Sequence, residues 1–111
     1  MPSATYRIFR EAMLREQQVT CIYQNRRRDV CPVIIGRDKD GAEAVLAWQF
    51  AGESNRGRLP PGGAWKCLKL KNVRNAASRD GPWQEGQSHQ SEQSCVAVVD
   101  IDINIDVRKR R

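Results

Sequence analysis

The fold is decided by residues 19–50, VTCIYQNRRRDVCPVIIGRDKDGAEAVLAWQF, which hold three apolar runs separated by two polar turns. The runs are rich in β-branched and apolar residues, as strands are, and occupy residues 19–23, 30–35 and 42–50. The Asp-Gly pair at 40–41 tolerates a positive φ, so we expect the second and third runs to form an antiparallel hairpin. Pro32 cannot donate a ladder hydrogen bond, so it should lie at an edge or a bulge.

Upstream of this stretch, the sequence predicts one amphipathic helix over residues 4–17 with Ser3 as its N-cap. Its apolar residues recur four positions apart and form a single stripe: Ile8, Phe9, Ala12 and Met13. Such a stripe needs a partner surface, and everything downstream is typical of a sheet.

Downstream, we expect two further strands, over residues 65–73 and 95–107, joined by polar loops. The loops cover residues 51–64, with four glycines and two prolines, and residues 75–94, where Trp83 should pack down as an anchor. In the last strand, every second residue is apolar and faces one way: Val99, Ile101, Ile103, Ile105 and Val107.

One helix followed by five strands predicts a mainly β domain that spans residues 1–111. A small antiparallel barrel of about five strands, closed at one end by the helix, fits this order. A flat five-stranded sheet with the helix on one face is the alternative.

Composition places the chain among globular proteins, with 40% hydrophobic and 29% charged residues in 111. This length argues against a large cofactor enzyme, and we expect no cofactor. No apolar run approaches the length that spans a bilayer, and the first eleven residues carry three charges, unlike a signal peptide. We therefore expect a cytoplasmic protein with no membrane partner.

The charge is basic, with 19 Lys and Arg against 13 Asp and Glu, a net +6 that falls to +2 without the tail at residues 108–111. Such a tail either adds affinity for phosphates or an acidic partner, or is a solvated terminus. A second basic cluster, residues 26–28, is expected in a hairpin turn between two strands.

The cysteines are widely spaced, at Cys21, Cys31, Cys67 and Cys95, without a C-x-x-C pair. Since the only histidine is His89, a zinc site is not expected. In a chain without an export signal, we expect buried, reduced thiols rather than disulfides.

The order of these motifs resembles the WYL domain family. The resemblance runs through Cys21-Ile22-Tyr23, then Arg28-Asp29-Val30-Cys31-Pro32 as R-x-V-x-P, and then Cys67-Leu68-Lys69-Leu70 leading to Val73, over about residues 6–75. Of the family's name-giving tripeptide only the leucine stands at residues 44–46, and Asn72 stands where the family has an arginine. The resemblance implies an SH3- or Sm-like β-barrel that senses a nucleotide-like ligand or binds nucleic acid in a regulatory role.

The candidate ligand-binding residues are Tyr23, Arg26, Arg28 and Lys69. The resemblance covers three of them, Tyr23, Arg28 and Lys69, and they would join aromatic stacking to phosphate contact. Alternatively, Tyr23 packs in the core with its hydroxyl at the rim, and Arg28 forms a structural ion pair. Trp48 is expected in the core, and Trp65 either packs under a loop or lines a groove.

Catalysis is not expected. Three carboxylates share one face of the last predicted strand, Asp100, Asp102 and Asp106, and either bind magnesium or calcium or pair with Lys69 and Lys71. A cysteine nucleophile would need His89 beside it, and no phosphate-loop motif follows the glycines at 62–63.

Two functions follow as expectations: a non-catalytic regulatory module that senses a ligand or binds nucleic acid, or a protein–protein interaction module. Only eighteen residues precede Val19, so we expect no DNA-binding helix-turn-helix. A module without its own output would form a homodimer or dock on a separate regulatory subunit, for which the long last strand offers an edge.

Overall fold

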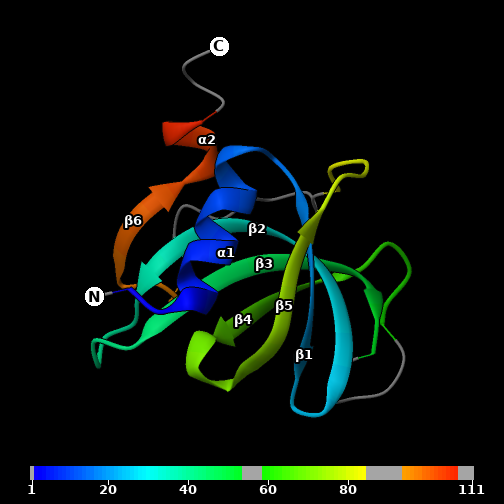
Figure 1. The fold of residues 1–111 in the computed structure, drawn as a ribbon, viewed down its shortest axis with the longest axis horizontal. Helices are drawn as coiled ribbons and strands as arrows, with labels where there is room; N and C mark the ends of the chain where they lie inside the picture. Colours follow the sequence, from blue (N-terminus) through cyan, green and yellow to red (C-terminus); the bar gives the residue numbers. More distant parts are fainter. Residues whose placement is uncertain (1, 54–58, 85–93, 108–111) are drawn as a thin grey trace.

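The computed structural model describes residues 2–53, 59–84 and 94–107. It is mainly β, with an N-terminal helix and one six-stranded antiparallel sheet (Figure 1). The elements are α1 (Ala4–Leu14), β1 (Gln18–Tyr23), β2 (Arg26–Arg37), β3 (Glu43–Gly52), β4 (Ala64–Lys69), the 3₁₀ turn η1 (Leu70–Asn72), β5 (Val73–Arg79), β6 (Val98–Asp102) and α2 (Ile103–Asp106). No helix in the described ranges is long and apolar enough to cross a membrane.

The predicted N-terminal helix is confirmed, although it ends earlier than expected. The Ser3 side chain accepts a hydrogen bond from the Tyr6 amide at 3.1 Å and caps the helix. The chain leaves the helix at Glu16, whose φ of 51° is left-handed, and the Gln17 amide bonds back to the Ala12 carbonyl. Phe9, Ala12 and Met13 are fully buried, as the apolar stripe predicts.

The sheet has the order β4-β3-β2-β1-β5, and β6 pairs with the far half of β2. The Asp-Gly hairpin between β2 and β3 is confirmed, with Gly41 at a φ of 85°. Residues 26–30 of β2 pair with β1, and residues 34–37 pair with β6. Pro32 lies between these two paired segments, beside a register shift, where its missing N–H costs little.

Strand β1 and the end of β4 are tied by one hydrogen bond, although two strands lie between them in the sheet order. The Tyr23 hydroxyl accepts a hydrogen bond from the Lys69 amide at 3.2 Å. In a flat sheet these strands would lie about 14 Å apart, more than a tyrosine side chain can span. The sheet is therefore strongly curled. It is not closed, because no pairing joins β4 to β5 in the part of the chain that the structure describes.

The expected strand over residues 65–73 is wrong in its second half. Strand β4 ends at Lys69, η1 turns the chain, and β5 occupies residues assigned to a loop. Figure 1 shows η1 joining the two strands at opposite ends of the sheet order. Asn75 has a φ of 54° and lies at the irregularity in the pairing of β5 with β1, which a residue tolerant of left-handed geometry permits.

The last predicted strand is also shorter than expected, because α2 replaces its second half. The Asp102 side chain accepts from the Asn104 amide at 3.0 Å, and Asp106 accepts from the Asp102 amide at 2.8 Å. These local side-chain bonds satisfy backbone groups that a strand would leave for a partner. Asp106 therefore does not share a strand face with Asp100 and Asp102.

Apolar residues gather in two clusters. The main core lies between α1 and the sheet and includes Phe9, Val45 and Leu68. The second core, named here for its place outside the main one, consists of Val33, Ile34, Ala44, Leu46, Cys95, Val96 and Ile103, with Trp65, Trp83 and Val107 packed against it. Trp83 thus anchors its segment, as predicted.

Cys67 and Cys95 form a disulfide, so the expectation of four reduced thiols is wrong for this pair. Their Cα atoms lie 5.6 Å apart because the curled sheet brings β4 beside the returning C-terminal segment, across 28 positions of sequence. A cross-link of this span contributes about 3–4 kcal/mol in the chain-entropy account. Cys21 and Cys31 are buried thiols outside this disulfide, as expected.

We predict that Tyr23→Phe lowers the free energy of unfolding by about 1 kcal/mol, because the Lys69 amide loses its acceptor in a partly buried place. Urea unfolding followed by circular dichroism measures the change. An unchanged free energy of unfolding in Tyr23→Phe would contradict this role for Tyr23.

Candidate functional site

The structure brings three of the four predicted ligand-binding residues together. Tyr23 ends β1, Arg28 lies in β2 and Lys69 ends β4. The Arg28 guanidinium lies 5.2 Å from the centre of the Tyr23 ring, and the Tyr23 hydroxyl meets the Lys69 amide. Arg26 forms its ion pair elsewhere, with Glu53 at 3.3 Å.

Arg28 is buried, with 2% of its surface exposed. Its guanidinium donates to the Tyr23 carbonyl, the Gln49 side-chain oxygen and the Gln24 side-chain oxygen, each at 3.3 Å. Burial lowers the pKa of Arg28, but a guanidinium remains protonated in proteins. The side chain therefore holds β1, the following turn and β3 together. The expected hairpin turn at residues 26–28 is wrong, because all three residues lie in β2 and the turn is at Gln24 and Asn25.

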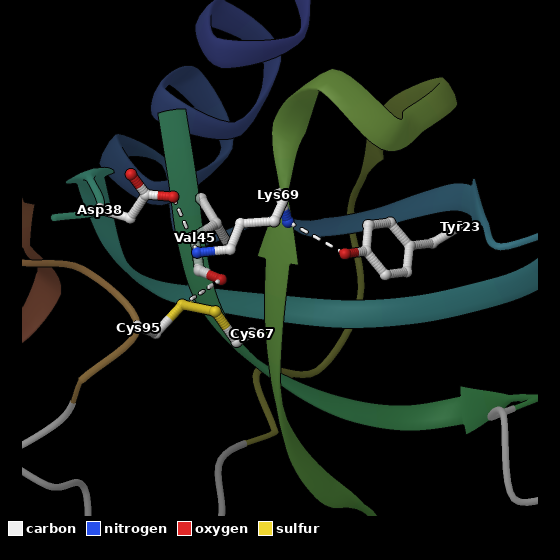
Figure 2. Close-up of a disulfide and its surroundings, with 6 residues drawn as sticks. All are labelled: Tyr23, Asp38, Val45, Cys67, Lys69 and Cys95. Carbon is white, nitrogen blue, oxygen red and sulfur yellow. Dashed lines mark hydrogen bonds and ion pairs between the residues drawn. A yellow bond between two sulfur atoms is a disulfide. The ribbon is translucent and has the colours of Figure 1, made fainter. Parts of the chain in front are cut away.

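Lys69 is held by Asp38, as Figure 2 shows. The ammonium group lies 2.9 Å from one carboxylate oxygen of Asp38, while the other oxygen accepts from the Asp40 and Ala42 amides. The hydrogen bond from Lys69, with those backbone bonds, lowers the pKa of Asp38 to about 2. Lys69 therefore stabilises the β2–β3 turn, and the predicted pairing of Lys69 with the last strand's aspartates is wrong.

A shallow polar hollow of about 380 Å³ lies beside this cluster, at the β1–β2 turn. Its lining comes from the turn, from η1 and from β5: Gln24, Asn25, Lys71, Asn72 and Arg74. Gln24 and Asn25 both have positive φ, 54° and 61°, as the two-residue turn of a twisted hairpin requires. The 3₁₀ turn η1 presents Lys71 and Asn72 beside them, so the hollow exists only where the two chain reversals meet.

Two of the amide side chains in the lining are hydrogen-bonded to arginines. Arg74 donates to the Asn25 side-chain oxygen at 2.9 Å, and Arg28 donates to the Gln24 side-chain oxygen. The side-chain amides of Gln24, Asn25 and Asn72 each also carry an NH₂ group, which is a hydrogen-bond donor. Within the described ranges, neither Lys71 nor Arg74 is paired with a carboxylate, and no acidic residue lines the hollow. Two cations and amide donors without a carboxylate suit an anion.

The other candidates take structural roles. Asp100 accepts from the Tyr6 hydroxyl at 2.5 Å, and the described residues hold no group of three His, Cys, Asp or Glu able to bind a metal. Burial raises the pKa of Cys21 to about 11, which keeps its thiol protonated at neutral pH. His89 and the tail at 108–111 lie outside the described residues.

Trp48 of β3 and Trp65 of β4 lie side by side on the face of the sheet that is turned away from α1, called here the outer face. Trp48 is half-buried rather than fully in the core, and its ring meets Trp65 edge-on with 5.0 Å between centroids. The Trp48 indole donates to the Gly62 carbonyl at 3.1 Å. Trp65 packs against the second core.

The hollow was not predicted from the sequence. The sequence marked Asn72 only as a departure from the WYL pattern, and Lys71 only as a partner for the aspartates of the last predicted strand. The available signal was the polar stretch K-N-V-R at residues 71–74 directly after an apolar run. Nothing local indicates that this stretch meets residues 24–25, because the contact depends on the pairing of β5 with β1, about fifty positions away in sequence.

In comparisons with known proteins, no family model, no curated protein and no solved structure matches the chain.

We predict that Arg28→Ala lowers the free energy of unfolding by about 3 kcal/mol, because it leaves three buried or partly buried oxygens without their donor. Arg27→Ala, one position earlier in β2, is the matched control. Arg27 is exposed and pairs with Asp29 at 3.6 Å, so its loss should cost under about 0.5 kcal/mol. Similar stability of the two variants in urea unfolding would refute the structural role of Arg28.

We predict that Asp38 stabilises the fold at neutral pH and that this stabilisation is lost as the pH falls from about 4 to about 2. The sign follows from a carboxyl whose pKa is lower in the folded chain than in the unfolded chain. Asp38→Asn keeps an oxygen for the turn amides but loses the pair with Lys69. Its melting temperature should lie below that of the parent at pH 7 and approach it at pH 2. A constant difference across that range would count against this assignment.

Proposed function

We propose that this chain is a non-catalytic regulatory module that binds a phosphate-bearing ligand, either a nucleotide or a nucleic-acid backbone, at the hollow beside the β1–β2 turn. The observation that carries the proposal is a lining in which two cations, Lys71 and Arg74, stand with the side-chain amides of Gln24, Asn25 and Asn72 and without a carboxylate. Phosphate oxygens accept hydrogen bonds and carry the complementary charge.

The WYL resemblance supports the same class of ligand by an independent route. In that reading, basic and aromatic residues hold the ligand, and the candidates Tyr23, Arg28 and Lys69 cluster beside the hollow. The contacts of Arg28 and Tyr23 give these two residues a positioning role, because Arg28 holds Gln24 and the Tyr23 hydroxyl holds the end of β4 just before η1. We therefore assign direct ligand contact to the hollow residues and positioning to Arg28 and Tyr23. The finer SH3- or Sm-like barrel assignment is part of this proposal, supported by the curl of the sheet.

A protein–protein interaction module is the second candidate function. Val98 and Val99 of β6 are 59% and 46% exposed, and Ile105 of α2 is 61% exposed. The described strands pair β6 only with β2, so one edge of β6 is open to another chain.

The test is binding of single-stranded RNA, single-stranded DNA, duplex DNA and a nucleoside triphosphate to the full chain, measured by fluorescence polarisation across a salt series. We predict that Lys71→Ala with Arg74→Ala weakens binding at least tenfold. For single strands it should reduce the slope of log affinity against log salt by about 1.4, since two phosphate contacts are lost.

Arg37→Ala with Lys39→Ala is the matched control, because it removes the same charge at the other end of β2. A further variant with alanine at residues 108–111 measures the contribution of the tail. Equal losses in the hollow variant and the control would mean that net charge alone drives binding. If the full chain binds none of these ligands, or the hollow variant binds as the parent does, the proposal fails and a protein partner becomes the better hypothesis.

A further inference from the structure

The disulfide fastens one end of a continuous C-terminal segment, residues 95–107, called here the strap. Cys95 begins the strap and is bonded to Cys67 in β4. The strap then supplies Val96 and Ile103 to the second core, and β6 pairs with β2 between them. The cross-link therefore closes the strap over the outer face of the sheet, beside Trp65.

Other contacts hold the strap independently of the disulfide. The Tyr6 hydroxyl donates to Asp100, Ile101 is part of the main core, and four residue pairs join β6 to β2. These contacts lie beyond residue 97. Nearer the disulfide, the strap is held by the buried Val96 side chain and by the Ala97 amide, which donates to the Arg37 carbonyl. Loss of the disulfide therefore loosens the first residues of the strap more than the rest.

The site accommodates both redox states of Cys95. Its sulfur lies 3.4 Å from the Val45 carbonyl oxygen, as Figure 2 shows. A disulfide sulfur has no hydrogen to donate to that carbonyl, whereas a thiol has one. Reduction therefore gives Cys95, a buried residue, a hydrogen-bond acceptor that is already in position.

Access to the disulfide is one-sided. Cys67 is exposed and Cys95 is buried, so an attacking thiolate reaches the bond through the β4 side. Cys21 and Cys31 are buried within the sheet, at 2% and 0% exposure, and are shielded from exchange.

We propose that the Cys67–Cys95 disulfide is a reversible redox latch on the strap, opened by a dithiol reductant. One thiolate of the reductant attacks the Cys67 sulfur, and the Cys95 sulfur leaves and takes up a proton. The second thiol of the reductant then displaces Cys67, so two electrons and two protons pass to the chain and the reductant becomes a disulfide. This latch does not depend on the proposed binding function.

The test compares the oxidised full chain with the same chain in excess dithiothreitol, by hydrogen exchange and mass spectrometry. The Ala97 amide, which donates to the Arg37 carbonyl at 2.8 Å, reports on the start of the strap. We predict exchange at least about tenfold faster in residues 95–97 on reduction, while α1 and β1 stay better protected than residues 95–97. Alkylation of the reduced, folded chain should label Cys67 ahead of Cys21 and Cys31, and reoxidation should restore the Cys67–Cys95 bond.

Two variants serve as controls. Cys67→Ser should show the fast exchange without reductant and no further response to it, and Cys21→Ala should respond as the parent does. Loss of far-UV circular dichroism on reduction would make the bond a structural staple and overturn the proposal. A bond that resists dithiothreitol, unchanged exchange at residues 95–97, or reoxidation to other cysteine pairs would also overturn it. Because the parent chain itself is titrated, the result does not depend on either variant folding.

Discussion

The buried guanidinium of Arg28 is the interaction on which the rest of the structure depends. A buried charge must have its hydrogen bonds made, and Arg28 makes them to the end of β1, to the turn and to β3. It also lies against the Tyr23 ring, whose hydroxyl fixes the end of β4. From there, Lys69 holds Asp38 in the β2–β3 turn. The series of contacts that starts at this desolvated charge thus connects β1, β2, β3 and β4 with the β1–β2 and β2–β3 turns.

The hollow is a consequence of the same arrangement. Arg28 donates to the side-chain oxygen of Gln24, and Arg74 donates to that of Asn25, so arginines hold both residues of the β1–β2 turn in place. Tyr23 and Arg28, which match positions of a ligand-binding set, are buried and hold the surrounding residues in place. Under the proposed function, substitutions that affect binding are separable from those that affect stability, because Lys71 and Arg74 are exposed and Arg28 is not. Substitution of Arg28 would report on folding before it reported on a ligand.

The two cores have different attachments. The main core is enclosed by α1 and the curled sheet, with contributions from nearly every element. The second core depends on a segment that reaches the sheet from the far end of the chain, held by backbone pairing and by the disulfide. This difference explains why a change at Cys67 and Cys95 should act on the strap more than on the helix and β1.

Local chemistry in the sequence determined the capped helix, the first three strands, the Asp-Gly hairpin and the anchoring role of Trp83, because caps, β-branched runs and turn residues act over a few positions. The resemblance to the WYL family marked Tyr23, Arg28 and Lys69 as a group, without indicating that Arg28 would be buried. The tertiary structure alone decided the break between β4 and β5, the replacement of the last strand's second half by α2, the disulfide and the hollow. Each of these depends on residues far apart in sequence meeting as the sheet curls, or on side chains competing with the sheet for backbone groups. A one-dimensional pattern does not carry that information.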